Sequence, residues 1–301
     1  MDKTQISKNI VSKIDFSLKN LPDDVRISTI TMTCNLDTLI DIQNVGRYID
    51  LGFGSIVCVK YKTNNNKMED NTVIRSLIKM KKSREKNKKN SKRKNFNNQA
   101  TLIVDVKNKR RINVKIFKNG AIQMTGCKSI DDFYHSLEIV CRELKKKKAI
   151  YDKQTKTIIP KHFITNYETV NTDQIKNFRV HLINCNFKVG FLIDREKLHG
   201  LLLKSGVRSI LEPNIHACVN IKFNYKNKDT ISIFVFESGS IIITGAKTEN
   251  HIIEAYKFIT KVLFENYDTI VKNNIESFLE RDDVKQLIEN VGKQNQLTAL
   301  C

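Results

Sequence analysis

Apolar and polar residues alternate in short stretches near the N-terminus, and this alternation predicts a strand. Ile30, Met32 and Cys34 alternate with threonines, which is the two-residue period of a half-buried strand. The spacing then becomes helical, and it predicts a helix that runs to about Ile49 and that carries the apolar residues Leu39, Ile40, Ile42 and Val45.

The same patterns return further along the chain. Strands are predicted near 101–106 and 112–117, and Asn119-Gly120 is typical of a hairpin turn that leads into a fourth strand through Thr125. After Gly126 the spacing changes to that of an amphipathic helix, with apolar residues at Phe133, Leu137, Val140, Cys141 and Leu144.

One phrase of this pattern occurs twice. The segment FKNGAIQMTGCK, which begins at Phe117, returns 119 residues later as FESGSIIITGAK, which begins at Phe236, and six of its twelve positions are identical. Upstream, the sequence around Cys185 resembles that around Cys34. The second copy also ends in a helical pattern, formed by Ile252, Ala255, Tyr256, Ile259, Val262 and Leu263. The chain therefore contains an internal repeat.

Each copy is predicted to fold as strand, helix, three strands and helix, an α+β arrangement in which helices cover only one face of the sheet. Alternation directs Val114 and Ile116 toward the helices and leaves Asn113, Lys115 and Phe117 on the open face. In the second copy Ser232, Phe234 and Phe236 take the open positions. Large phenylalanines on an uncovered sheet face are typical of a binding surface.

The two copies differ in length because the first holds a surplus between its first helix and its second strand. The surplus contains the run KMKKSREKNKKNSKRK, Lys79 to Lys94. We interpret 64–98 as a surface insertion that is largely disordered, because its charge leaves little to bury. The predicted organisation is an N-terminal extension at 1–24, a first repeat at 25–148, a linker at 149–177, a second repeat at 178–266 and a helical C-terminal extension at 267–301.

Charge narrows the choice of partner. The 301 residues include 52 Lys and Arg against 32 Asp and Glu, a net charge of +20, which exceeds what solubility requires. Nucleic acid is the leading partner, and an anionic membrane surface is second. The lysine run is either a solvated loop, a nuclear-import signal or a clamp on DNA phosphates.

Other features argue against an enzyme or a secreted protein. Seven cysteines never form a C-x-x-C pair, so we expect reduced thiols in a nuclear or cytosolic compartment. No signal-peptide core or continuous apolar span of membrane length is present. The histidines lack metal-ligand spacing, and no phosphate loop, carboxylate pair or Ser/His/Asp arrangement is evident, so neither catalysis nor a metal or other cofactor is expected.

The tandem units, each with F-x-x-G, then T-G-x-K, then a long helix, resemble the TATA-binding protein family. The segment STITMTCNLD, from Ser28, resembles the start of that family's first repeat, and Leu211-Glu212-Pro213 resembles its Y-E-P motif. The resemblance implies a pseudo-two-fold saddle in which two repeats form one curved antiparallel sheet, with helices on the convex face and DNA on the concave face. Abundant Lys, Asn and Ile without Trp further indicate an AT-rich genome, such as that of a large DNA virus or a protist.

The resemblance also implies roles for individual residues. Phe117 and Phe236 match the wedge phenylalanines that open base steps in the minor groove. Lys222 stands where the family has a phosphate-binding arginine. Other groove-facing positions match Thr125, Thr244, Gln123, Ile242, Val25, Ile27, Thr29, Thr31, Val180, Leu182 and Asn184. Glu212 and Pro213 match the edge that binds factors of the IIB type, and IIA-type factors and RNA polymerase are further implied partners of a monomer on DNA.

The sequence departs from the family pattern at four places. Val25 and Val180 stand where each half of the family carries a base-contacting asparagine. His216 stands at the second wedge of the second copy, and Gln99 or Ala100, with Phe96 nearby, at that of the first copy. These departures favour a weaker bend or a different DNA site.

Several alternatives remain open. Phe117 and Phe236 also fit the core of two stacked sheets, Thr125 and Thr244 fit ordinary strand ends, and Glu212-Pro213 fits a simple turn. The leading hypothesis is a promoter factor that binds AT-rich minor groove in a nucleus or at a site of viral transcription. The alternative is an adaptor that keeps the fold and partner edges but has little specific DNA binding. A saddle domain that assists a repair or cleavage enzyme is a third option, against which the absence of any catalytic segment argues.

Overall fold

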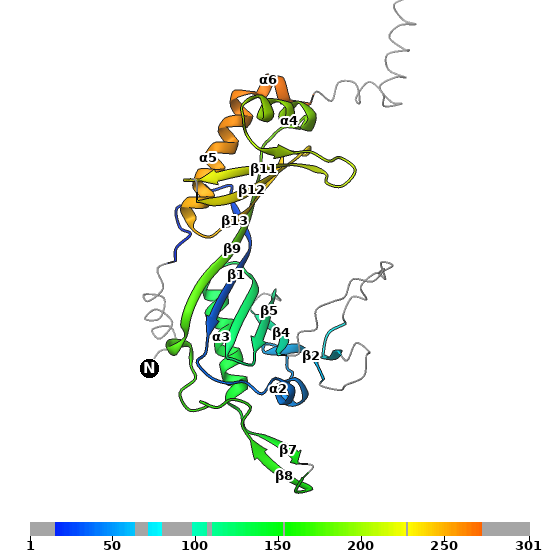
Figure 1. Cartoon of the computed structure of the whole chain (residues 1–301), viewed down its shortest axis with the longest axis vertical. Helices are drawn as coiled ribbons and strands as arrows, with labels where there is room; N and C mark the ends of the chain where they lie inside the picture. The colour runs from blue at the N-terminus through cyan, green and yellow to red at the C-terminus, as the bar shows by residue number, and fades with distance from the viewer. Residues whose placement is uncertain are drawn as a thin grey trace, which may run out of the picture. The chain divides into compact units, whose positions relative to one another are not determined.

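The computed structural model describes residues 16–63, 72–79, 98–106, 110–152, 154–226 and 228–272 (Figure 1). Contacts divide the chain into two compact units, one formed by residues 1–185 and 244–252 and the other by residues 186–243 and 253–301. β9 (Lys176–Lys188), β13 (Ser240–Ala246) and α5 (Glu249–Glu265) each pass from one unit into the other.

The first unit is built on a one-sided antiparallel sheet with the strand order β9-β1-β6-β5-β4-β2-β3. Helices α2 and α3 pack against β2, β4 and β6, and they meet the buried row of each strand, for example Ile30, Met32 and Cys34 of β1. The elements are β1 (Arg26–Asn35), α2 (Ile42–Tyr48), β2 (Ile56–Lys62), β3 (Thr72–Ser76), β4 (Gln99–Val106), β5 (Arg110–Phe117), β6 (Ala121–Cys127) and α3 (Ile130–Lys145).

Helix α3 begins where the sequence supplies a cap. The Ser129 hydroxyl accepts a hydrogen bond from the Asp132 amide at 3.2 Å, and acidic Asp131 and Asp132 occupy the first turn, where the helix dipole favours negative charge. Arg110 donates to both oxygens of Asp132, at 2.7 and 2.6 Å. This pair fixes the start of β5 to the start of α3.

The second unit repeats the arrangement with the strand order β10-β11-β12-β13. The alternation in β12 follows the prediction, because Ile233 and Val235 are fully buried whereas Phe234 and Phe236 are not. Phe223 stacks on Phe258 of α5 at 5.0 Å between ring centroids. The elements are α4 (Arg195–Lys204), β10 (Ser209–Ile210), β11 (Cys218–Tyr225), β12 (Asp229–Phe236) and α6 (Tyr267–Ile270).

The same backbone hydrogen bonds recur in both units. The Leu36 amide donates to Gly120 and the Val189 amide to Gly239, while the Ile40 amide donates to Lys118 and the Ile193 amide to Glu237. The two donors of each equivalent pair, Leu36 with Val189 and Ile40 with Ile193, lie 153 residues apart in the sequence. By this bonding Cys185 corresponds to Met32, so the sequence match of Cys185 with Cys34 was two residues out of register.

Each unit is also closed by a segment that follows its second helix. Ile40 forms a bridge with Ile164, and Ile193 forms a bridge with Val271. Asp41 and Asp194, which precede the first helix of their units, donate from their amides to Phe163 and Ile270 respectively, at 2.7 Å in both cases. The repeat therefore extends beyond the second helix, to about residue 165 in one copy and 272 in the other.

The glycines of the doubled phrase are explained by the backbone. Gly120 and Gly239 have φ of 79° and 76°, and Gly126 and Gly245 have φ of 105° and 93°, values that residues with a Cβ rarely adopt. Gly120 and Gly239 turn the hairpins, and an added Cβ would lie 2.3 Å from the Thr38 carbonyl or 2.4 Å from the Phe191 carbonyl. The glycines of the repeated segment are thus required by the backbone conformation of the two hairpins, independently of what the sheet face binds.

The structure adds strands that the sequence patterns missed. β2 and the short β10 follow the first helix of each copy, and the insertion predicted at 64–98 begins just after β2. Within the predicted insertion Thr72–Ser76 forms β3, an edge strand paired with β2, so this part is not disordered. Arg75 secures it by donating to the carbonyls of Gly46 and Ile49, each at 2.9 Å.

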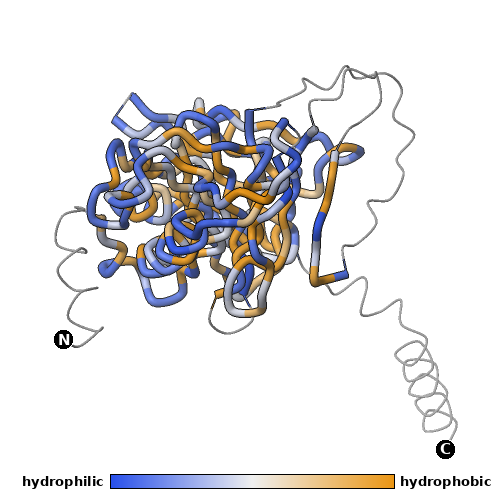
Figure 2. The backbone as a smooth tube through the Cα atoms, turned by 90° about the horizontal axis from the view of Figure 1, so that it is seen from below, coloured by the Kyte–Doolittle hydropathy of each residue, from blue (hydrophilic) through white to orange (hydrophobic). Residues whose placement is uncertain are grey.

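The stretch interpreted as a linker carries a hairpin of β7 (Lys148–Asp152) and β8 (Thr157–Lys161), followed by the short 3-10 helix η2 (Thr172–Gln174) (Figure 1). Lys148 forms an ion pair with Asp50 at the base of the hairpin. Beyond α6, the predicted C-terminal helix falls on residues 273–301, outside the described part. Figure 2 shows apolar and polar stretches alternating along the backbone. No helix in the described ranges has both the length and the apolar composition of a membrane span.

Candidate nucleic-acid interface

The candidate site is the sheet face that the helices leave uncovered in each unit, which we call the open face. In the first unit strand register aligns its side chains in rows. Thr33 of β1 is opposite Gln123, Gln123 is opposite Lys115, Lys115 is opposite Thr101, and Thr101 is opposite Lys60. This row carries hydroxyl, amide and ammonium groups across five strands.

A second row contains the residues on either side of Thr125. Thr31 is opposite Thr125, which is exposed, and Thr125 is opposite Asn113. The Thr29 hydroxyl accepts a hydrogen bond from the Gly126 amide at 3.0 Å. Thr29 therefore supports the irregular end of β6, and Thr125 is not merely the last residue of its strand.

Phe117 and Phe236 end β5 and β12 on the open face. Both are half-buried, whereas the preceding Ile116 and Val235 are fully buried against the helix side. Gln99 lies opposite Phe117 and Cys218 lies opposite Phe236. Neither phenylalanine lies between two stacked sheets in the described part of the chain, so each ring has one accessible side.

The open face of the second unit is more apolar than that of the first. Phe234 lies opposite Asn220, and Lys222 lies opposite Ser232, with the Lys222 ammonium donating to the Ser232 hydroxyl at 2.7 Å. The side-chain oxygen of Asn220 is buried and has no hydrogen-bond partner in the described structure. Ile242 of β13 is half-buried.

Residues of β9 add polar groups to the open face. The Thr244 hydroxyl donates to the side-chain oxygen of Asn184, and His181 Nε2 lies 2.8 Å from the Thr33 hydroxyl. The family resemblance implied Val180, Leu182 and Asn184 as the groove-facing residues of this strand, and His181 was not among them.

The remaining predicted residues are placed as follows. Ile27 is half-buried within β1, and Val25, only 9% exposed, precedes that strand in a turn in which its amide donates to Pro22. His216 lies in an exposed turn whose amides donate to the Glu212 carbonyl. Val180 and Leu182 are half-buried. Phe96 lies outside the described residues, as does the lysine run beyond Lys79.

Three cysteine thiols of the described part are buried. Burial raises the pKa of the Cys34, Cys127 and Cys141 thiols to about 12, so they stay protonated at neutral pH. No set of three His, Cys, Asp or Glu side chains in the described ranges is arranged to hold a metal ion. The arrangement is suited to surface binding.

Comparisons with known proteins point to one family. The model of the family "Transcription factor TFIID (or TATA-binding protein, TBP)" matches residues 72–147 and 177–266. A protein of Acanthamoeba polyphaga mimivirus, described as "TATA-box-binding protein-like", is 35% identical over 286 residues, which are 90% of this chain and 73% of that protein. The solved structure of Methanococcus jannaschii TBP is 14% identical, with a TM-score of 0.49, and the match covers 80% of this chain and 99% of that one.

Proposed function

Because this chain belongs to the TATA-binding protein family, whose members are transcription factors, we propose that its open face binds the minor groove of AT-rich promoter DNA and bends it. The fold that the family implies is the one predicted from the sequence, an α+β saddle of two tandem repeats. The observation that carries the proposal is the pair of half-buried phenylalanines, Phe117 and Phe236, on faces that no described helix covers.

The chemistry of the open face suits this role. The minor groove presents few distinguishing polar groups, so a surface of apolar, hydroxyl and amide side chains can follow its floor and respond to its width and deformability. Phe117 and Phe236 supply apolar wedges that unstack a base step. The Thr125 hydroxyl can donate to the acceptors on the groove floor, while the Thr244 hydroxyl, which already donates to Asn184, positions the Asn184 amide for this role.

Three lysines on the open faces of the two units suit contact with DNA phosphates. Lys222 is held by Ser232, and Lys115 and Lys60 continue the row that begins at Thr33. Phosphate contacts position the protein on the duplex without reading its sequence. We therefore assign sequence preference to the Phe, Thr and Asn side chains and overall affinity to the lysines.

The wedge mechanism can be tested by measuring DNA bending. An AT-rich duplex that carries a fluorescent donor and an acceptor at its two ends should show closer ends when wild-type protein binds. The Phe117→Ala, Phe236→Ala double variant should lose most of this change, because unstacking a base step costs a few kcal/mol that the rings offset. Phe53→Ala is the matched control, because Phe53 is 73% exposed and lies in the turn between α2 and β2, outside the strands that form the open face. Equal bending by the double variant and the wild type would contradict the mechanism.

A second candidate function, that of an adaptor, is favoured by the turn before β11. Ile215 is 68% exposed there, and the neighbouring Glu212 and Pro213 are also exposed, so the turn suits a protein partner of the IIB type. On this hypothesis Glu212→Arg abolishes recruitment of that factor, while the wild type binds DNA only weakly and in a salt-sensitive manner. A clear sequence preference at physiological salt would count against the adaptor and favour the promoter factor. As for partners and location, we propose IIA-type factors and RNA polymerase, in a nucleus or at a viral transcription site.

A further inference from the structure

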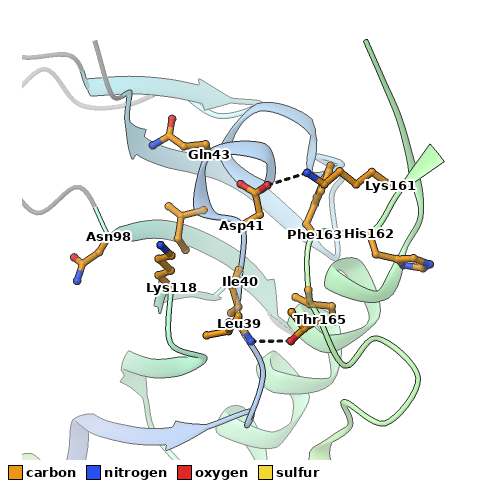
Figure 3. A pocket seen from close by; sticks show the side chains of 12 residues that line it. Leu39, Ile40, Asp41, Gln43, Asn98, Lys118, Lys161, His162, Phe163 and Thr165 are labelled. Atoms are coloured by element: carbon orange, nitrogen blue, oxygen red, sulfur yellow. Dashed lines mark hydrogen bonds and ion pairs between the residues drawn. The ribbon is translucent and has the colours of Figure 1, made fainter. Parts of the chain in front are cut away.

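The first unit contains a pocket of about 650 Å³ between the β5–β6 turn and the segment that follows β8 (Figure 3). Its floor is formed by Ile40, Ile42 and Phe163, each no more than 5% exposed. Leu39 stands at its rim and is 57% exposed. The pocket therefore has an apolar floor, and one exposed apolar side chain lies at its rim.

Two lysines stand on opposite sides of the entrance. Lys118 belongs to the β5–β6 turn and Lys161 ends β8 (Figure 3). Lys161 lies 3.7 Å from Asp41, whose carboxylate already accepts from the Asn44 amide at 3.1 Å and from the Asn44 side chain at 2.7 Å. Lys118 is exposed and makes no ion pair within the described ranges. The entrance thus carries a net positive charge, because Asp41 pairs with only one of the two lysines.

In the second unit a carboxylate stands at the position that corresponds to Lys118. There Glu237 stands where the first unit has Lys118, since the Ile193 amide donates to Glu237 and the Ile40 amide to Lys118. Lys272 approaches the Glu237 carboxylate to 2.7 Å and Arg195 to 3.3 Å. The hydrogen bond from Lys272 lowers the pKa of Glu237. A carboxylate of the chain itself occupies this position, and the pocket beside it measures only about 260 Å³.

We propose that the pocket of the first unit binds an acidic and apolar peptide segment of a partner protein. An apolar side chain of the peptide packs on Ile40, Ile42 and Phe163, and a carboxylate next to it binds Lys118 and Lys161. The two units are thus opposite in charge at this position, because Glu237 pairs with cations of its own chain whereas Lys118 is left to pair with a carboxylate of the peptide. Charge complementarity favours this occupant over a basic peptide, and the pocket does not involve the open face, so the proposal is independent of DNA binding.

The test uses the full-length protein and a fluorescein-labelled peptide, Glu-Glu-Leu-Phe-Glu-Glu-Leu-Glu, in an anisotropy titration at physiological ionic strength. We expect saturable binding by the wild type and at least about tenfold weaker binding by Lys118→Glu, which places a carboxylate at the entrance. Leu39→Ser should weaken binding by a few-fold. A peptide with Lys in place of every Glu should not bind.

A control variant separates the pocket from the general attraction of a basic protein for an acidic peptide. Lys228→Glu makes the same charge change at an exposed position in the second unit and should alter the affinity less than twofold. With benzoylphenylalanine in place of the peptide's Phe, photocrosslinks should map to residues 39–43 or 161–165. Equal binding by Lys118→Glu and the wild type, no binding by the wild type, or crosslinks elsewhere would overturn the proposal. Circular dichroism verifies that each variant is folded.

Discussion

The hydroxyl of Thr244 donates a hydrogen bond to the side-chain oxygen of Asn184, while at the corresponding place in the first repeat Thr125 faces Thr31. The bond holds the Asn184 amide so that its NH₂ group is left to donate outward. Adenine N3 and thymine O2 accept such a bond in the minor groove, whereas guanine adds a competing NH₂. The two repeats therefore differ in the polar group that they carry at this position, an amide in one and a hydroxyl in the other.

Replacing Asn184 tests this difference. On the proposed function, Asn184→Val should weaken binding to an AT-rich duplex by about tenfold or more, which is the range for one good base contact. Thr31→Val should have a smaller effect. Anisotropy titrations with duplexes that carry A·T or G·C at the central base pairs give both affinities. An unchanged A·T preference in Asn184→Val would show that this amide does not read bases.

The hairpin glycines predict a large effect on stability. Gly120→Ala should lower the free energy of unfolding by about 2–4 kcal/mol, because φ is positive and the new Cβ meets the Thr38 carbonyl. Gly200→Ala in α4 is the matched control, since nothing lies within 4 Å of its Cβ, and it should be neutral or stabilising by up to about 1 kcal/mol. Urea unfolding followed by circular dichroism measures both. Equal stability of the two variants would contradict the strain argument.

The Arg110–Asp132 pair predicts a loss of stability in acid. Burial alone would raise the pKa of the Asp132 carboxyl, but hydrogen bonds from Arg110 and from the Lys128 amide lower it below the ordinary 3.8. A carboxyl whose pKa is lowered by folding stabilises the protein above its unfolded-state pKa, and this stabilisation is lost as the pH falls through the folded-state pKa.

Asp132→Asn should therefore be less stable than the wild type at pH 7 by about 1 kcal/mol or more. The difference should shrink as the pH falls below about 4. Urea unfolding at a series of pH values measures it, and Asp131→Asn, which changes an exposed neighbour in the same helix turn, serves as the control. A difference that does not depend on pH would refute the assignment to this carboxyl.

The lysine run predicts a change in affinity without a change in sequence preference. Gln in place of each Lys and Arg between positions 80 and 94 should weaken DNA binding and flatten the plot of log affinity against log salt, by about one unit of slope for each phosphate that is no longer neutralised. Residues 64–79 should be retained, because β3 lies within them. Selection from a random DNA pool with both proteins should return the same sequences. Different sequences would mean that the run contributes to recognition.

Much of this fold was predictable because the two copies of the repeat can be aligned with each other through their shared segment. The phrase that begins at Phe117 and Phe236 supplied the hairpins, the buried Val114, Ile116, Ile233 and Val235, and the helices that follow. β10, with two residues, is too short to show a period. β3 was hidden by the charge around it, and its stability depends on Arg75 reaching two carbonyls, a tertiary contact that no local pattern records.

The candidate site was predictable to the extent that strands alternate strictly. The open-face positions of β5 and β12 follow from alternation, as does Thr125. His181 did not follow, because alternation along β9 places it on the side opposite to Val180 and Leu182, and only its hydrogen-bonding distance from Thr33 links it to the site. The pocket beside Lys118 could not be foreseen, since it joins segments around residues 40, 118 and 163 that only the closing bridge brings together.

The closing bridge of each repeat also shows how much the connection that leads to it can differ in length. The β7–β8 hairpin lies between α3 and Phe163 in the sequence. The Asp41 amide still donates to Phe163, and Ile40 still forms its bridge with Ile164, although the hairpin lengthens this connection. The second copy makes the equivalent bonds with only a short connection from α5. The same closing bonds are thus compatible with a long connection in one repeat and a short one in the other.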